Sequence, residues 1–146
     1  MSKLVSILVL SATISIAALH KPNQKKSEYI EVGYYNTTNP EEGEAFIMHK
    51  SGERYIKALD KDERIVLSSV RKYIYESVKI DLINSSFYAQ RSNKQNGINR
   101  YISMGNGDSE QTYEWAIGSC NDHKLLAYYE DFVKEFRIAF AKEYDN

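Results

Sequence analysis

The feature that most constrains the fold is a hairpin pattern in the second half of the chain. Apolar and polar residues alternate over Ile98–Met104 and again over Thr112–Ile117, and Gly105–Asp108 separates the two runs. Alternation with a period of two is typical of half-buried strands, and glycine supplies the positive φ that a tight turn needs. This segment therefore predicts two antiparallel strands.

The first half of the chain predicts three more strands. Glu28–Tyr35 is dense in apolar and aromatic residues, and a loop is expected over Asn36–Gly43, where an Asn-Pro pair, two acids and a glycine follow one another. Glu44–Lys50 and Glu53–Ala58 then alternate on either side of a Ser-Gly pair. Such a pair between alternating runs predicts a second tight hairpin.

A helix is expected between these two halves. Apolar residues recur at helical spacing over Lys61–Val78, and Asp60 with Glu63 resembles the capping box that starts a helix. The end of this helix is open, because residues 79–90 either continue it or form a strand over Leu82–Gln90. The count of about six strands given below includes this segment as a strand, and the two alternatives stay open.

The C-terminal helix has the stronger pattern. Asn121 is expected to cap it, and Glu130 and Lys134 form a favourable i,i+4 pair on its polar side. Large apolar side chains recur along one stripe at Leu125, Tyr129, Phe132, Phe136 and Phe140. A stripe of this kind predicts a helix that packs against a core.

Together these segments predict an α+β fold: an antiparallel sheet of about six strands in the order βββα-βββα, with two helices packed on one face. That arrangement buries both apolar stripes and leaves the other face of the sheet to display tyrosines. The domain is expected over residues 28–146, a length that suits a single core.

The N-terminus predicts export. Lys3 is the only charge in residues 1–19, and the chain is apolar from Leu4 to Leu19. A short positive start, an apolar run and small residues at its end are typical of a signal peptide, with cleavage before Ala18 and a polar tether over residues 20–27. An uncleaved membrane anchor is the alternative, although the run is shorter than the roughly 20 residues that span a bilayer. A core segment of a cytosolic protein is a third, weaker interpretation.

This interpretation places the protein outside the cytoplasm, either periplasmic or secreted, or else anchored to a membrane through residues 4–19. The net charge of −1 gives no basic surface for nucleic acid. A single cysteine, Cys120, excludes an intramolecular disulfide. Tyrosine is the unusual component, with twelve copies, and its amphipathic ring suits both half-buried strands and binding surfaces.

Cys120, Asp122 and His123 are the candidate catalytic residues. They lie where a strand is expected to lead into the first turn of the C-terminal helix, so the thiol would experience the positive end of the helix dipole. His123 would act as its base and Asp122 would polarise the imidazole. The alternative is that these residues have only structural roles. In that case Asp122 stabilises the N-terminus of the helix and Cys120 fills space below it.

No metal site and no cofactor are expected. Beyond Cys120 and His123, only His20 and His49 remain as histidine ligands, and their spacing is not that of a structural zinc site. Acidic side chains suggest paired-carboxylate chemistry only if two of them lie at a suitable separation, and solvated charges are the simpler interpretation. The acidic residues considered for this chemistry are Glu41, Glu42, Glu44, Asp108, Glu110 and Glu114.

The remaining signal is for recognition. Tyr29, Tyr35 and Tyr101, with the neighbouring Arg100, are expected on the uncovered face of the sheet. Rigid aromatic rings beside an arginine are good anchors for a protein partner. The sequence therefore favours a small exported, non-catalytic module that binds another protein, as an interaction or inhibitor-like protein does. The alternative is a small extracytoplasmic hydrolase or thiol enzyme that uses Cys120 and His123.

Overall fold

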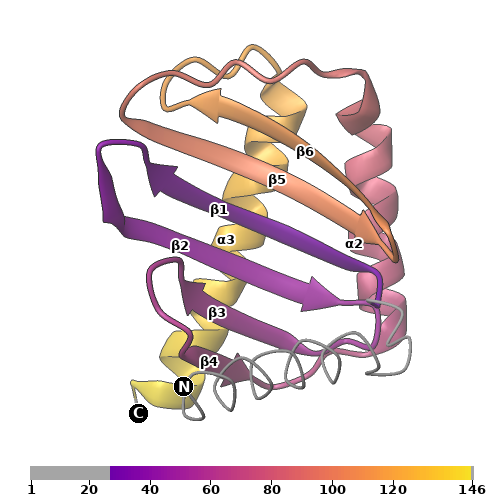
Figure 1. Cartoon of the computed structure of the whole chain (residues 1–146). Helices are drawn as coiled ribbons and strands as arrows, with labels where there is room; N and C mark the ends of the chain where they lie inside the picture. Colours follow the sequence, from indigo (N-terminus) through magenta and orange to yellow (C-terminus); the bar gives the residue numbers. More distant parts are fainter. Residues whose placement is uncertain (1–26, 146) are drawn as a thin grey trace, which may run out of the picture.

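The computed structural model describes residues 27–145. In this range a six-stranded antiparallel sheet has the strand order β4-β3-β2-β1-β5-β6, and both helices lie on one of its faces (Figure 1). This architecture confirms the predicted α+β fold. In chain order the elements are β1 (Tyr29–Asn36), β2 (Asn39–His49), β3 (Arg54–Ala58), β4 (Arg64–Leu67), α2 (Lys72–Asn84), a 3₁₀ turn (Phe87–Ala89), β5 (Ile98–Asn106), β6 (Ser109–Ala116) and α3 (His123–Tyr144).

The predicted signal peptide and most of the predicted tether lie outside the described residues. Residues 1–19 fall wholly outside the range, and of the tether over residues 20–27 only Ser27 is described. All described strands and helices lie within the domain predicted over residues 28–146.

The central strand β1 sets the register of the sheet. Val32 stands opposite Phe46 of β2 and opposite Ile102 of β5. The same row continues to Ile56 of β3 and to Tyr113 of β6. All five side chains are buried in the core cluster beneath the helices. Burial of this continuous row therefore links four strand pairings to helix packing.

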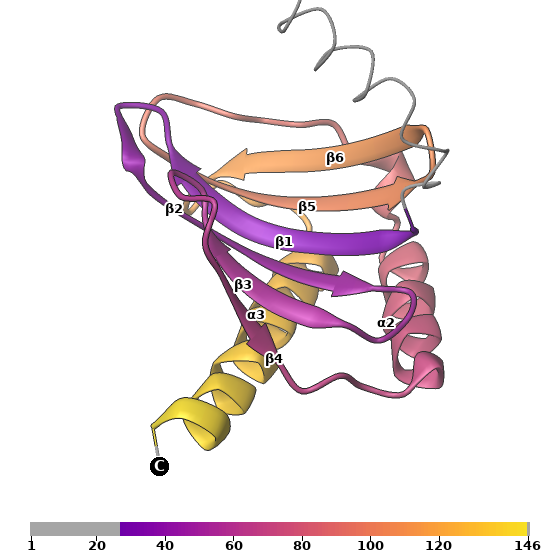
Figure 2. The same ribbon diagram turned by 60° about the horizontal axis from the view of Figure 1, so that its bottom comes forward.

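Helix α3 crosses the covered face of the sheet from the β5–β6 side to the β4 side (Figure 1, Figure 2). Phe136 packs edge to face on Phe46, with ring centroids 5.8 Å apart, a geometry that aromatic pairs favour. The predicted apolar stripe is confirmed as the side of α3 that packs on the core. Its members are Leu125, Tyr129, Phe132, Phe136 and the half-buried Phe140.

Both predicted hairpins are confirmed. β2 and β3 pair antiparallel across a turn that contains Gly52, whose φ is +94°. β5 and β6 pair across a turn that contains Gly107, whose φ is +64°. An L side chain rarely adopts either conformation, so glycine at these two positions fixes where each strand reverses.

The helix predicted over Lys61–Val78 is wrong in its first part. Arg64–Leu67 instead forms β4, which pairs antiparallel with β3, and α2 begins after it. Asp60 and Glu63 lie in the exposed connection between these two strands, so they do not form a capping box for α2. The β-branched pair inside β4 favours a strand, and pairing covers the outer edge of β3. The stabilisation that β4 obtains by pairing with β3 is not visible in the local spacing of apolar residues, which alone predicted a helix.

Of the two alternatives for residues 79–90, the helix continues, and the strand counted over Leu82–Gln90 does not form. α2 continues to Asn84, and the 3₁₀ turn over Phe87–Ala89 follows. Leu82 and Phe87 are both fully buried in the core cluster. The apolar residues that suggested a strand thus fill the core from the end of a helix. The sheet still has six strands because β4 supplies the sixth.

The loop expected over Asn36–Gly43 is shorter than predicted. β2 begins at Asn39, and only Thr37 and Thr38 separate it from β1. The Asn36 side chain accepts hydrogen bonds from the backbone N–H and the hydroxyl of Thr38, at 3.0 and 2.8 Å. This side-chain turn closes the hairpin without glycine. The remaining residues of the expected loop form the start of β2, where the register with β1 is irregular.

Asp122, not Asn121, caps α3. Its carboxylate accepts hydrogen bonds from the backbone N–H groups of Lys124 and Leu125, each at 2.9 Å. Its second oxygen accepts from the Gln90 amide at 3.0 Å. The expected cap was therefore placed one residue too early.

The cap gives a matched pair of substitutions. Asp122→Ala removes the acceptor for two helix N–H groups, and we expect it to lower the free energy of unfolding by about 1 kcal/mol. Asn121→Ala is the control, with an expected change below about 0.5 kcal/mol. Urea unfolding followed by circular dichroism measures both. Equal losses in the two variants would contradict the assignment of Asp122 as the cap.

Candidate functional site

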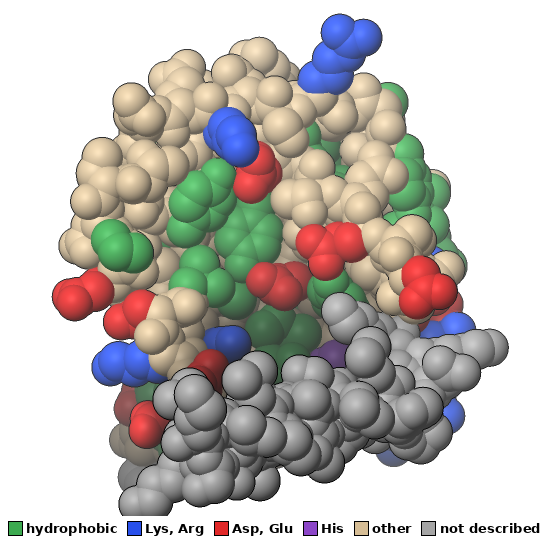
Figure 3. All heavy atoms as spheres, viewed as in Figure 1, with side chains coloured by type: hydrophobic (Ala, Val, Ile, Leu, Met, Phe, Trp, Pro, Cys, Tyr) green, Lys and Arg blue, Asp and Glu red, His purple; other side chains and the backbone are tan. Residues whose placement is uncertain are grey.

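The face of the sheet opposite the helices is the candidate site, and we call it the open face. No helix described between residues 27 and 145 lies on it (Figure 1). Figure 3 views the molecule from this side and shows hydrophobic side chains, a class that includes tyrosine, with acidic side chains among and beside them. The open face is therefore where polar and aromatic side chains of the strands meet solvent.

Strand alternation places three of the predicted tyrosines together on the open face. In β1, Ile30 and Val32 are buried beneath the helices, so Tyr29 and Tyr35 project to the other side. Tyr101 of β5 stands opposite Gly33 of β1 in the register. The Tyr35 and Tyr101 rings lie 6.1 Å apart, which confirms that β1 and β5 bring them together.

Two of these rings lie over glycines of the neighbouring strand. A Cβ at Gly33 would come within 2.9 Å of Cε1 of Tyr101, and a Cβ at Gly105 would overlap the ring of Tyr29. Gly33 faces Tyr101 and Gly105 faces Tyr29 in the β1–β5 pairing. Because these glycines have no side chain, each tyrosine ring covers the backbone of the adjacent strand.

Each of the three tyrosine hydroxyls donates to a carboxylate. Tyr101 donates to Glu31 at 2.6 Å, and Tyr35 donates to Glu114 at 3.2 Å. Tyr29 donates to Glu110. A ring that is packed on a strand and hydrogen-bonded at its tip has little rotamer freedom left. The three tyrosines are therefore held in fixed positions, with Tyr29 and Tyr35 half-buried and Tyr101 buried at 8% exposure.

The carboxylates surround a hollow of about 280 Å³, which we call the acidic hollow. Glu31, Glu110 and Glu114 line it, and no lysine or arginine of the described residues does. Its apolar wall is formed by Tyr35, Tyr101 and Leu59. A hollow of this size and charge suits a single cationic side chain or a small organic cation.

The electrostatics of the hollow follow from this crowding of acids. Burial raises the pKa of Glu31 and the charge of Glu110 raises it further, while the hydrogen bond from Tyr101 and the charge of Lys57 lower it, with a net rise. Burial and the nearby carboxylates raise the pKa of Tyr29 and of Tyr101. Both phenols therefore remain protonated donors at neutral pH. The three carboxylates make the lining of the hollow acidic, and Lys94 pairs with Glu114 at its edge, at 4.0 Å.

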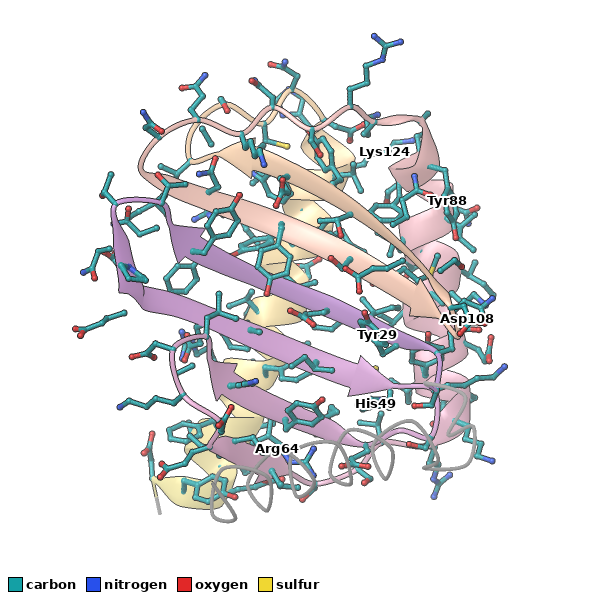
Figure 4. The ribbon with its side chains drawn as sticks, in the orientation of Figure 1. Tyr29, His49, Arg64, Tyr88, Asp108 and Lys124 are labelled. Carbon is teal, nitrogen blue, oxygen red and sulfur yellow. The ribbon has the colours of Figure 1, made fainter. Side chains whose placement is uncertain are left out.

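A second aromatic row extends the open face toward β4 (Figure 4). The His49 ring lies 6.1 Å from that of Tyr29 and 5.5 Å from that of Tyr55. Tyr55 in turn lies beneath the guanidinium of Arg64, at 4.7 Å, a cation–π distance. The row joins four strands and places positive charge at the end of the open face away from the acidic hollow.

Arg100 does not share the open face with the tyrosines. Its guanidinium lies 5.0 Å from the ring of Tyr129, on the helix-covered side of the sheet. Adjacent residues of a strand point to opposite faces, so Arg100 and Tyr101 are separated by the sheet itself. The prediction that placed Arg100 beside Tyr101 was wrong for this reason.

Sequence reasoning missed Glu31 as a site residue and named Glu110 and Glu114 only as members of an acidic set. The available signal was alternation, because Glu31 lies two residues from Tyr29 and so shares its face. Glu110 and Glu114 reach the hollow through the β5–β6 register, which pairs Glu110 with Gly105 and Glu114 with Tyr101. The other acids lie elsewhere, and Glu44 forms an ion pair with Arg137 at 2.5 Å.

The structure does not bring Cys120, Asp122 and His123 into a catalytic arrangement. The Cys120 thiol donates to the backbone carbonyl of Asp122 at 3.3 Å, and the Asp122 carboxylate caps α3. The His123 side chain is exposed, and no hydrogen bond of the described residues joins it to Cys120. Among residues 27–145, no cluster of His, Cys, Asp and Glu is arranged to hold a metal ion.

Comparison with known proteins gives no match, either to a protein-family model or to a curated protein. Within residues 27–145, no helix has both the length and the apolar character needed to cross a membrane. The geometry of the open face is therefore the basis for the function proposed below.

The raised pKa of Glu31 predicts a pH dependence of stability. In the unfolded chain this carboxyl titrates near its ordinary value of about 4.3, and in the folded protein it titrates at higher pH. The folded state holds the proton more tightly, so the free energy of unfolding falls as pH rises from about 4.3 through the folded value. Glu31→Gln removes this titration, while its amide oxygen still accepts from Tyr101.

We therefore expect the stability of the Glu31→Gln variant, relative to the unsubstituted protein, to increase as pH rises from about 4 to 7. Urea unfolding at a series of pH values measures the difference. Glu63→Gln makes the same change at an exposed acid in the β3–β4 connection, outside the hollow, and is the control. A constant difference for Glu31→Gln would contradict the prediction.

Proposed function

We propose that this protein is a non-catalytic binding module that acts outside the cytoplasm and recognises another protein through its open face. The observation that carries the proposal is the acidic hollow, with three carboxylates around a fixed tyrosine surface. The proposal keeps the tyrosines that the sequence indicated and replaces Arg100 with Glu31, Glu110 and Glu114.

Preorganisation supports a binding role. A side chain that is ordered on binding costs about 0.5–1.5 kcal/mol, and this cost is already met when the free protein holds the ring in place. Tyr101 is packed over Gly33 and hydrogen-bonded to Glu31, and Tyr29 is held in the same way over Gly105. The surface can therefore bind a partner with little further ordering.

The charges indicate what the partner presents. Three acidic side chains with aromatic neighbours favour a lysine or arginine, whose charge would face the carboxylates and whose stem would pack on Tyr35 and Leu59. A negative patch also accelerates encounters with a basic surface. We therefore expect a protein partner with a basic side chain at the centre of its contact surface.

The alternative function, a hydrolase or thiol enzyme that uses Cys120 and His123, has less support. The Asp122 carboxylate is engaged with two backbone N–H groups and with Gln90, so it is not free to orient His123. Binding through the open face requires no group that the arrangement lacks.

A comparison of variants tests the binding role. The chain is used as bait in the extracellular or periplasmic fraction of its native cells, and the affinity of the retained protein is then measured with purified components. Glu110→Lys reverses a charge on the rim of the hollow, and we expect it to weaken binding by about tenfold or more. Because Glu110 is exposed, the substitution leaves the core intact.

Two control variants accompany this measurement. Glu130→Lys makes the same charge change at an exposed site on α3, behind the sheet, and Cys120→Ser removes the thiol. Both are expected to bind the partner as the unsubstituted protein does. A partner that binds the Glu110→Lys variant with unchanged affinity would refute the role of the hollow. Substrate turnover that Cys120→Ser abolishes would support the enzyme instead.

The proposed location has its own test, which is the intact mass of the protein in fractions of its native cells. We expect a soluble species outside the cytoplasm that lacks about seventeen N-terminal residues, because a signal peptidase cuts after small residues such as Ala17. A full-length species in the membrane fraction would indicate an anchor. A full-length species in the cytosol would contradict export.

A further inference from the structure

A further cavity lies on the other side of the sheet, between α2 and α3. The two helices diverge behind the sheet (Figure 2), and the groove between them has a volume of about 730 Å³. They are joined across it where the Tyr128 hydroxyl donates to the carbonyl of Val78 at 3.1 Å. The groove is separate from the acidic hollow, because the sheet lies between them.

The floor of this groove is apolar. Ile74 and Val78 line it from α2, Phe132 and Phe136 from α3, and Met48 from the sheet. Small-molecule sites are commonly concave, mostly apolar and about 300–1,000 Å³ in volume. The groove has the size and the lining of such a site.

Charged side chains occupy the rim, and the positive ones are partly engaged. Arg54 donates from Nε and from Nη2 to the carbonyl of Ser68, at 3.0 and 2.9 Å, and its guanidinium lies 5.6 Å from the ring of Phe136. Glu135, also on the rim, is close enough for its charge to act on Arg54. Arg54 therefore has two carboxylates near it at one end of the groove, Glu143 and Glu135.

The rest of the rim has excess negative charge. It carries Asp81 from α2 and Asp131 from α3 against Lys124 alone. Of the ion pairs among residues 27–145, none involves Asp81 or Asp131. The Asp81 charge raises the pKa of Tyr128, in addition to the effect of burial, so Asp81 faces the same space as that phenol.

We infer that this groove binds a small amphipathic ligand with an apolar body and a cationic head group. The body lies on Ile74, Val78 and Phe132, and the head group is directed toward the carboxylates of Asp81 and Asp131. This site goes beyond the proposed protein-binding role, because it uses the opposite face of the domain and a different class of ligand.

Three probes that share one tail test the charge of the ligand. Decyltrimethylammonium, decyl sulfate and decyl maltoside are titrated below their micelle concentrations into the full-length chain, by calorimetry and by methyl NMR. The cationic probe is expected to bind at one site and to shift the methyl signals of Ile74, Val78 and Ala127. We expect the anionic probe to bind at least about tenfold more weakly, with the neutral one between them.

Two sets of variants locate the binding. Ala127 is an exposed residue on the wall of the groove, so Ala127→Trp fills the space without a change in the core, and it is expected to abolish binding. Ala141→Trp, at an exposed site further along α3, is the matched control. The Asp81→Asn, Asp131→Asn double variant is expected to lose the preference for the cationic probe, while Glu130→Gln keeps it.

Several outcomes would overturn the inference. These are the absence of saturable binding by the cationic probe, equal affinity for all three probes, tighter binding of the anionic probe, and binding that Ala127→Trp leaves unchanged. Glu110→Lys serves as a cross-check, because the cationic probe could also enter the acidic hollow. If that substitution abolishes binding and Ala127→Trp does not, the ligand occupies the open face and the groove site is refuted.

Discussion

The register between β1 and β5 is the constraint on which both faces of the sheet depend. It places Val32 opposite Ile102 in the core and Gly33 opposite Tyr101 on the open face. A shift by one residue would exchange the two faces, so the buried row under the helices also fixes the tyrosines above the sheet. The acidic hollow is thus a consequence of core packing, because the same pairing that buries Val32 brings Glu31 beside Tyr101.

On the open face, the clustering of carboxylates around Glu31 is unfavourable for stability. A half-buried carboxylate is unfavourable, and Glu31 keeps its place through the short hydrogen bond from Tyr101 while Glu110 adds repulsion. A sheet face optimised for stability alone would not gather three acids around Tyr35 and Tyr101. Such local conflicts occur more often at functional sites, although structural networks produce them as well. A cation from a partner would relieve the repulsion, which connects the electrostatic strain to the proposed role.

Local patterns predicted the elements whose partners are near in sequence. The β5–β6 hairpin is indicated by Gly107 at its turn, and α3 by its repeat of large apolar side chains. Both signals lie within a short stretch of sequence. β4 was missed because its strand pairing with β3 outweighs the helical spacing of its residues. The hollow was predicted only in part, since Glu114 meets Tyr35 across 79 positions of sequence and no local pattern contains that contact. Arg100 is different, because simple alternation would have placed it correctly.

Hydrogen bonds between elements give a structural reason for the abundance of tyrosine. With one cysteine the chain has no disulfide to join its elements, and tyrosine hydroxyls make many of the cross-element contacts. Tyr128 joins α3 to α2, Tyr144 joins α3 to β4 through the carbonyl of Val66, and Tyr75 joins α2 to Glu28 at the start of β1. Phenylalanine would fill the same volume without these hydrogen bonds. The tyrosines behind the sheet therefore hold the helices in place, and Tyr29, Tyr35 and Tyr101 join β1, β5 and β6 in the same way on the open face.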